Sequence, residues 1–388
     1  MSSETPLTHF KPREVGTSVA RLLVLGYMHD ITGVALTHDD QVLQLRPQDV
    51  VLPSCPDSPD ERCDDVLFRV TKFIDDLLIA YGEKPFYMCK TREDLAGHLV
   101  VGLAPHTSAG TVGRIVGFSK TQGLLCHPYF HCAMRRDCDG DESCVFLLLD
   151  AFLNFSKAFL PTSRGGTMDA PLVLTTILNP AEVDDMAFDM DIVSRYPKEL
   201  YEAALEYKNP SEIKISQVKK ILGTPNEDMA IAYTHPVSDI NAGVLCSSYK
   251  TLPSMQDKLG AQMKLAEELR CVDERDVARL VIEKHFIRDV KGNLRKFSTQ
   301  QFRCMNCNEK YRRPPITRNG ACTACGGKVG FTISEGSVVK YLVPMESLAK
   351  NYNVPAYLQQ TIALTRRQIE EVFGKDSESQ TGLGAWFG

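Results

Sequence analysis

Apolar residues recur every three or four positions across residues 66–81, and this is the spacing of one helix face. Gly82 follows as a stop signal. Residues 142–159 are apolar around most of a helical circumference, so we expect a buried helix there. From residue 197 onward the helical spacing dominates. It predicts helices at 197–207, 211–222, 253–269, 273–286, 334–350 and 355–373.

Shorter patterns of the β type occupy the first half of the chain. Turn residues separate three apolar runs, which predict strands at 21–25, 33–36 and 42–45. The β-branched run at 171–177 predicts a buried strand. Residues 96–118 are rich in glycine and small side chains. Because glycine permits close backbone approach, we expect an irregular core around a site in this stretch.

Composition describes a folded chain with more than one domain. Hydrophobic residues make up 43% of the 388 residues and charged residues 24%, so the chain can bury real cores and is not disordered as a whole. The formal net charge of −5 argues against a uniformly basic surface for nucleic acid. It leaves room for local basic patches.

Targeting signals and cysteine count suggest a reducing compartment. The first residues carry no basic and no apolar segment, so they do not indicate a secretory signal. The most apolar stretch, 144–155, contains Asp150 and is too short to span a bilayer. We therefore expect a cytoplasmic protein without a membrane partner. Thirteen cysteines, an odd number, fit reduced thiols with a metal site better than a disulfide framework.

Two Cys-x-x-Cys pairs form the most specific motif of the chain. Cys304 and Cys307 make the first pair, and Cys322 and Cys325 make the second. Each pair directs two thiolates inward, and two pairs complete a tetrahedral site that suits Zn²⁺. Since four protein ligands fill the coordination sphere, we expect a structural zinc ribbon at 302–332, with two glycines forming the turn after the second pair. Four unrelated thiols are the alternative.

The cysteine motif lies in a basic stretch. Residues 284–318 contain ten Lys or Arg residues and two acidic ones, a local net charge of +8. Tyr311 precedes Arg312 and Arg313. Basic residues interleaved with an aromatic one predict a patch that faces phosphate or a protein partner. A solvated face without a partner is the alternative.

A second strong motif is an acidic loop. Asp137, Asp139 and Asp141 alternate along the chain, and Gly140 precedes the last of them. Alternation places carboxylates on one side of an extended chain, and a bend at the glycine would make them converge. Converging carboxylates repel one another unless a cation lies between them, and such ligands select Mg²⁺ or Mn²⁺. An EF-hand is excluded because Glu142 occupies the position that needs glycine. A solvated turn is the alternative.

Basic residues and histidines precede the acidic loop. Arg135 and Arg136 come directly before it, and His127 and His131 lie slightly upstream. Cations beside a carboxylate-bound metal suit a phosphate substrate, because metal and guanidinium share the phosphoryl charge. The histidines are candidate proton donors or phosphate contacts, with a structural role as the alternative. A further acidic group at 182–191 lacks a glycine hinge and basic neighbours, so we interpret it as surface.

The C-terminal residues 375–388 lack periodicity and predict a flexible tail. Gln380, Leu383, Trp386 and Phe387 fit the pattern Q-x-x-[aliphatic]-x-x-[aromatic]-[aromatic]. On one 3₁₀ turn the three apolar side chains would form a plug with the glutamine as a polar hook. An exposed plug needs a partner's groove, and this pattern matches the peptide box that binds ring-shaped DNA sliding clamps. A tail without function is the alternative.

Longer motifs give the chain a resemblance to a known family. They are LTHFKPREVG at 7–16, GHLVVGLAPHTSAG at 97–110, CDGDE at 138–142, RGGTMDAP at 164–171, GNLR at 292–295 and YRRPP at 311–315. Through these motifs nearly the whole chain resembles the C-terminal part of the large subunit of archaeal family-D DNA polymerase. The resemblance implies a pair of double-psi β-barrels that face each other across the active site, as in multisubunit RNA polymerases.

The resemblance also implies roles and partners. It makes Asp139 and Asp141 the Mg²⁺ ligands of the second barrel, for two-metal nucleotidyl transfer from dNTPs to a DNA primer-template. The family usually has Asn at the position of Asp137, which leaves open whether Asp137 is a third, catalytic ligand. No stretch of this chain corresponds to the first barrel. The implied partners are the N-terminal part of the large subunit, the sliding clamp and the small exonuclease subunit. The resemblance implies that the basic helical region and the ribbon hold the small subunit and nearby DNA.

We therefore expect an α+β chain in five parts. They are a catalytic region with the second double-psi β-barrel at 1–250, a helical region at 251–301, the zinc ribbon at 302–332, C-terminal helices at 333–374, and the flexible tail at 375–388. Two functions stay open: a DNA-directed DNA polymerase active only in its assembly, or a non-catalytic scaffold that links the small exonuclease subunit and the clamp. A metal-dependent glycosyltransferase with a DxD loop would not explain the clamp-binding box.

Overall fold

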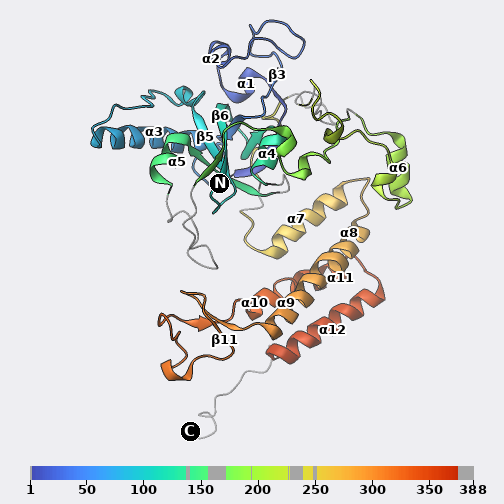
Figure 1. Ribbon diagram of the computed structural model, residues 1–388. Helices are drawn as coiled ribbons and strands as arrows, with labels where there is room; N and C mark the ends of the chain where they lie inside the picture. Colours follow the sequence, from blue (N-terminus) through green and yellow to red (C-terminus); the bar gives the residue numbers. More distant parts are fainter. Residues whose placement is uncertain are drawn as a thin grey trace. The chain divides into compact units, whose positions relative to one another are not determined.

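The computed structural model describes residues 2–136, 140–155, 172–193, 195–225, 227, 239–247 and 251–374. Within them the chain divides into two compact units, one ending at residue 247 and the other containing residues 251–374. Figure 1 colours the first unit from blue to green and the second from yellow to red. Each unit has its own hydrophobic core.

Strands of the first unit form one mixed sheet that closes on itself. They hydrogen bond in the order β4-β7-β1-β8-β5-β6-β9, and β4 also pairs with β6. This extra, parallel pairing closes all but β9 into a ring. The strands are β1 (Ser2–Pro6), β4 (Asp49–Pro53), β5 (Leu99–Leu103), β6 (Ala109–Ser119), β7 (Gly123–Cys126), β8 (Glu142–Leu147) and β9 (Val173–Thr175).

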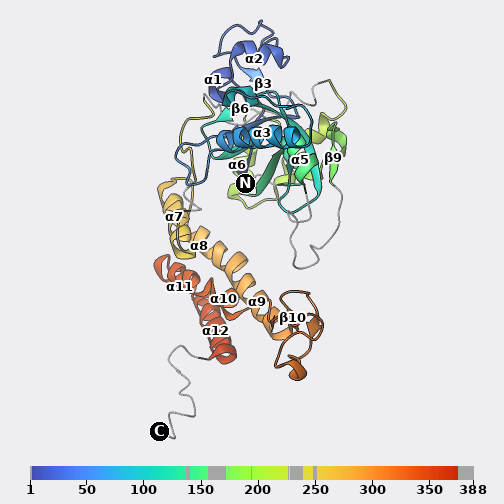
Figure 2. The ribbon, with the colours of Figure 1, turned by 90° about the vertical axis from the view of Figure 1, so that its left-hand side faces the viewer.

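Alternation along the strands divides their side chains between two cores. Val50 and Leu52 of β4 pack into one core, and Val51 between them packs into the other. The helices α3 (Cys63–Ala80) and α4 (Pro128–Ala133) contribute to the first core, whereas α1 (Pro12–Val15) and α2 (Val19–Val24) contribute to the second. Figure 2 shows α3 lying across the strands with α5 (Leu148–Asn154) next to it. The predicted helix at 66–81 is confirmed as α3.

The expectation of an irregular core at 96–118 is wrong, because β5 and β6 occupy most of it. The glycines instead leave room for neighbouring elements. A Cβ on Gly113 would lie 3.0 Å from the ring of Phe130, and one on Gly117 would lie 2.3 Å from the carbonyl oxygen of Val15. Glycine composition therefore indicated the close packing, but the strands that achieve it are regular.

Short apolar runs were the least reliable guide to secondary structure. The strand expected at 21–25 is wrong: these residues belong largely to α2, which begins where the Ser18 hydroxyl accepts a hydrogen bond from the backbone N–H of Arg21. Residues 33–36 form only an isolated bridge, and the strand expected at 42–45 is confirmed in its centre. A run of four or five apolar residues fits either a strand or a helical turn, so neighbouring groups decide between them.

The single helix expected at 142–159 is also wrong within the described residues. Its first part is the strand β8, paired with β5 and β1, and only from Leu148 does the chain become helical as α5. An apolar run without periodicity does not distinguish a buried strand from a helix. The strand predicted at 171–177 is confirmed as β9, yet Val173 and Ile177 are exposed rather than buried.

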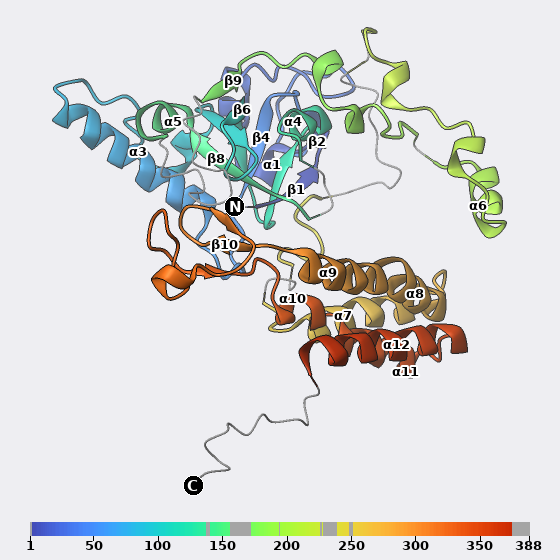
Figure 3. The same ribbon diagram turned by 60° about the horizontal axis from the view of Figure 1, so that its bottom comes forward.

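Helices and a small sheet build the second unit. Ile282, Phe286, Val290, Met345 and Leu358 lie in its core. Figure 3 shows α8 and α9 running on as one rod through a π-helical turn. The small sheet has the order β11-β10-β12. The elements are α7 (Met255–Glu268), α8 (Glu274–Leu280), the π-helix Val281–Phe286, α9 (Ile287–Thr299), β10 (Phe302–Cys304), β11 (Lys310–Tyr311), β12 (Val329–Gly330), α10 (Glu335–Val339), α11 (Leu342–Asn351) and α12 (Ala356–Phe373).

Predicted helices at 197–207, 253–269, 273–286 and 355–373 are confirmed, and that at 334–350 is confirmed in two pieces. The helix expected at 211–222 is wrong, because only two 3₁₀ turns form there. The remaining elements are β2 (His9–Phe10), β3 (Leu43–Gln44), α6 (Lys198–Leu205) and the 3₁₀ turns η1 (Arg92–Leu95), η2 (Pro180–Glu182), η3 (Asp185–Ala187), η4 (Pro210–Glu212), η5 (Val218–Lys220) and η8 (Ile316–Arg318).

Candidate metal centre and acidic loop

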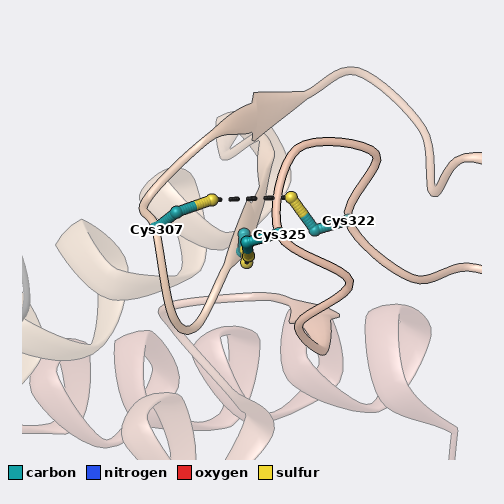
Figure 4. Close-up of side chains that lie close together, drawn as sticks. Cys307, Cys322 and Cys325 are labelled. Atoms are coloured by element: carbon teal, nitrogen blue, oxygen red, sulfur yellow. Dashed lines mark hydrogen bonds between the residues drawn. The ribbon is translucent and has the colours of Figure 1, made fainter.

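Four thiols converge in the second unit. The sulfur atoms of Cys304, Cys307, Cys322 and Cys325 all lie within 4.8 Å of one another. The Sγ–Sγ distance is 3.4 Å between Cys304 and Cys325 and 3.5 Å between Cys307 and Cys322. Figure 4 shows the side chains of Cys307 and Cys322 directed toward each other, with Cys325 next to them. The structure therefore brings together the four cysteines that the spacing selected.

The small sheet and two glycines position the thiols. β10 ends at Cys304 and pairs antiparallel with β11 and with β12. Gly326 adopts a φ of 73°, and a Cβ on Gly327 would lie 3.0 Å from Sγ of Cys304. A side chain at Gly327 would therefore enter the centre, as expected for the turn after the second pair.

The cysteine centre fits Zn²⁺ in the kind and separation of its donors. A tetrahedral site with Zn–S bonds of about 2.3 Å places sulfur atoms about 3.8 Å apart, close to the separations between these thiols. The hydroxyl of Tyr311 lies 3.1 Å from Sγ of Cys322, and this hydrogen bond contributes most to lowering the pKa of the Cys322 thiol. Zinc binds thiolates, so this contact favours the binding form.

The acidic loop lies between α4 and β8, and Asp137 and Asp139 lie outside the described residues. Gly140 has a φ of 116°, which confirms a glycine-dependent bend before the last carboxylate. The side chain of Asp141 is 42% exposed, so its carboxylate remains accessible. Glu142 then opens β8, where the neighbouring strand β1 pairs with it.

Arg136 connects the two ends of the loop. Its Nη1 lies 3.4 Å from a carboxylate oxygen of Asp141, and its Nε donates a 2.9 Å hydrogen bond to the carbonyl of Glu142. Arg135 is exposed and has a φ of 57°, an uncommon conformation for a residue other than glycine. Arg136 therefore makes contacts within the loop, whereas Arg135 is exposed to solvent.

Both histidines are buried, so a phosphate in solvent does not reach them. The ring nitrogen Nδ1 of His127 accepts a hydrogen bond from the backbone N–H of Tyr129 and so caps α4. The Nε2 of His131 lies 2.9 Å from the carbonyl oxygen of Thr5 in β1. Burial lowers the pKa of His131 to about 4. The structural alternative accounts for both positions.

The remaining predicted residues are basic or lie in the tail. Arg312 and Arg313 are exposed on the loop that follows β11. Gln380, Leu383, Trp386 and Phe387 lie outside the described residues. The acidic residues at 182–191 lie on the 3₁₀ turns η2 and η3 and their surroundings, where Asp184 caps η3.

One polar cluster was not foreseen from the sequence. A cavity of about 380 Å³ in the first unit is lined in part by Ser54, Arg62, Asp64 and Arg92. Burial acts to raise the pKa of Asp64, but hydrogen bonds from Arg62 and Ser54 hold it below its ordinary value. Arg92 also lies 3.9 Å from this carboxylate. These residues come from three separate segments of the chain, and only the tertiary structure brings their side chains together. No local sequence motif contains all of them.

Residues 1–258 match the family model of the DNA polymerase II large subunit DP2, catalytic domain. The chain belongs to this family. The DNA polymerase II large subunit of Methanococcus vannielii is 50% identical over 388 residues, which cover 99% of this chain and 33% of the relative. That of Archaeoglobus fulgidus is 48% identical over 385 residues, 98% of this chain and 33% of the relative.

The large subunit of Pyrococcus furiosus DNA polymerase II is 49% identical over 375 residues, 96% of this chain and 29% of the relative. This member of the DNA polymerase II large-subunit family therefore spans about a third of the length of these curated relatives. The catalytic-domain match contains the acidic loop, whereas the cysteine centre lies beyond it. Among the described helices none has the length and apolarity needed to cross a membrane.

Proposed function

We propose that this chain is the C-terminal part of a family-D DNA polymerase large subunit and supplies the metal-binding aspartates for nucleotidyl transfer. The observation that carries the proposal is the match of residues 1–258 to a polymerase catalytic domain, since this range contains the acidic loop. The closed ring of strands supports a double-psi β-barrel as the fold of this region. The loop enters that ring directly through β8.

Asp139 and Asp141 are the proposed ligands of Mg²⁺ or Mn²⁺, with Asp137 as the candidate third. The described member of this set, Asp141, offers an accessible carboxylate beside Arg136, and a carboxylate suits a hard cation. When bound, such ions activate the primer 3′-hydroxyl and neutralise the pyrophosphate leaving group. Arg136 orients Asp141, and Arg135 reaches the phosphates of the incoming nucleotide.

The second unit serves assembly in this proposal. Its four cysteines hold a structural Zn²⁺ in a ribbon at 302–332, between helical regions at 251–301 and 333–374. Arg312 and Arg313 are exposed within that ribbon, where they face DNA or the small exonuclease subunit. The tail at 375–388 carries the sliding-clamp box.

The test is primer extension by the polymerase assembled from this chain, the N-terminal part of the large subunit and the small subunit. The double substitution Asp139→Asn with Asp141→Asn should abolish extension and leave DNA binding intact. The matched control is Glu182→Gln with Asp185→Asn, which removes two exposed carboxylates and should leave extension unchanged. Retained synthesis by the double aspartate variant would sink the catalytic assignment and leave the scaffold function.

The clamp box calls for a separate measurement. Replacing Leu383, Trp386 and Phe387 by Ala should remove binding to an immobilised sliding clamp, because the apolar plug is lost. Extension in the absence of a clamp should stay at the wild-type level. If clamp binding survived the triple substitution, the box would have no role in it.

A further inference from the structure

Three basic residues form a straight row on α9. Arg288, Lys291 and Arg295 follow one another at intervals of three and four residues, so they share one helix face. All three are exposed. Lys284, in the π-helical turn, precedes them by four residues and is also exposed. Because Lys284 forms an ion pair with Glu283, the row itself is confined to α9.

Another face of α9, about 100° around the helix from the basic row, is fixed by packing. Ile287 and Val290 are buried in the core of the second unit, and Leu294 and Phe297 pack against it. Phe297 also lies against Phe373 of α12, with ring centroids 4.6 Å apart. Because this face is held in place, the helix cannot rotate, and the basic row stays directed to solvent.

Nearby carboxylates are engaged elsewhere. Asp289, on α9 itself, accepts a hydrogen bond from Asn293 and lies 3.9 Å from Nζ of Lys340. Glu283 pairs with Arg279 and Lys284. Among the residues that the structure describes, Arg288, Lys291 and Arg295 take part in no ion pair, so their charges are not neutralised within the unit.

The helix that carries the row, α9, is joined to the small sheet that contains the cysteine centre. Gln300 joins α9 to β10 and exchanges hydrogen bonds with the backbone of Ile333. Phe331 lies between Phe297 of α9 and Phe302 of β10, with centroid distances of 5.7 Å and 4.2 Å. These contacts attach the small sheet to the end of α9.

We propose that the row Arg288, Lys291 and Arg295 binds the phosphodiester backbone of double-stranded DNA. The helical rise places Arg288 and Arg295 about 10 Å apart along the axis, which is about three times the axial spacing of about 3.4 Å between charges on one DNA strand. Exposed, unneutralised Arg and Lys side chains in a fixed line suit a regular array of anions, and Arg binds phosphate in a bidentate manner. The choice of DNA over an acidic protein rests on the proposed function.

The test measures binding of a fluorescent DNA duplex to the full chain by anisotropy, between about 50 mM and about 200 mM salt. Replacing the row with Arg288→Gln, Lys291→Gln and Arg295→Gln should weaken binding by at least about tenfold at the lower salt. It should also reduce the slope of log affinity against log salt by about 2.7, since each phosphate contact contributes about 0.9. The thermal unfolding midpoint should not change.

A matched variant controls for net charge. Lys264→Gln, Lys350→Gln and Arg367→Gln remove three exposed positive charges from other helices of the same unit and should preserve the salt slope. Equal salt slopes for the two triple variants would overturn the proposal. It would also be overturned if the row variant lost binding to polyglutamate but bound DNA like the wild type, or if the wild type bound no DNA. Loss of extension by the aspartate variant is measured separately, so either proposal can fail alone.

Discussion

Arg136 and Asp141 approach within 3.4 Å across the acidic loop, between Nη1 of the arginine and a carboxylate oxygen. The same guanidinium donates hydrogen bonds to the carbonyl of Glu142. One side chain therefore contacts both the carboxylate at the end of the loop and the first residue of β8. Arg136 therefore places a positive charge next to Asp141 and links it to the start of β8.

Substitution of Arg136 should impair catalysis through the position of Asp141. Arg136→Ala removes the ion pair and the contacts to Glu142, and we expect a loss of extension rate of about a hundredfold in the assembled polymerase. Arg136→Lys keeps the charge but loses the planar fork, so its rate should be intermediate. Primer-extension rates at saturating nucleotide measure the effect. Wild-type rates in the alanine variant would contradict this role.

Metal removal should unfold the small sheet of the second unit. Cys307→Ser should lower the zinc content from about one ion per chain to near zero and reduce the thermal unfolding midpoint, because the site closes only with four ligands. Cys271→Ser, an exposed cysteine of the same unit outside the cluster, is the control and should retain the metal. Metal analysis together with thermal unfolding gives the answer. Equal zinc content in both variants would exclude the cluster as the site.

His131 should make the first unit sensitive to acid. Burial lowers the pKa of His131 from about 6.5 to about 4, so between these values the unfolded chain takes up a proton that the folded chain does not. The contribution of the buried, neutral His131 to the free energy of unfolding is therefore complete above pH 6.5 and is lost as the pH falls toward 4. Relative to His131→Gln, the wild type should lose roughly 3 kcal/mol of unfolding free energy over this range. Denaturant unfolding at several pH values measures it, and parallel curves for both proteins would disprove it.

Gly117 should not tolerate a side chain. Gly117→Ala would place its Cβ 2.3 Å from the carbonyl oxygen of Val15, a backbone atom that cannot move aside easily, and we expect about 3 kcal/mol of destabilisation. Gly260, exposed within α7, has open space around it. Gly260→Ala should instead stabilise the protein by about 1 kcal/mol. Thermal unfolding of the two variants should therefore shift in opposite directions, and a shared direction would refute the packing argument.

Local patterns predicted the features that depend on few neighbouring residues. The periodicity of α3 was sufficient because one helix face contributes Leu67 and Ile74 to the first core. The 142–159 run was not sufficient, because β8 owes its extended form to the partners β1 and β5. The 21–25 run likewise depended on a cap at Ser18. In both cases a partner outside the run selected the conformation.

The sequence by itself determined the four-cysteine set, the acidic motif and the membership of a polymerase family, since each is a property of residue types at fixed spacing. Tertiary structure alone decided that β4 pairs with β6 to close the ring, that His127 and His131 are buried, and that the row on α9 faces solvent. The physical reason is that burial and strand closure depend on contacts between segments far apart in the chain. Their free energy is absent from any local pattern.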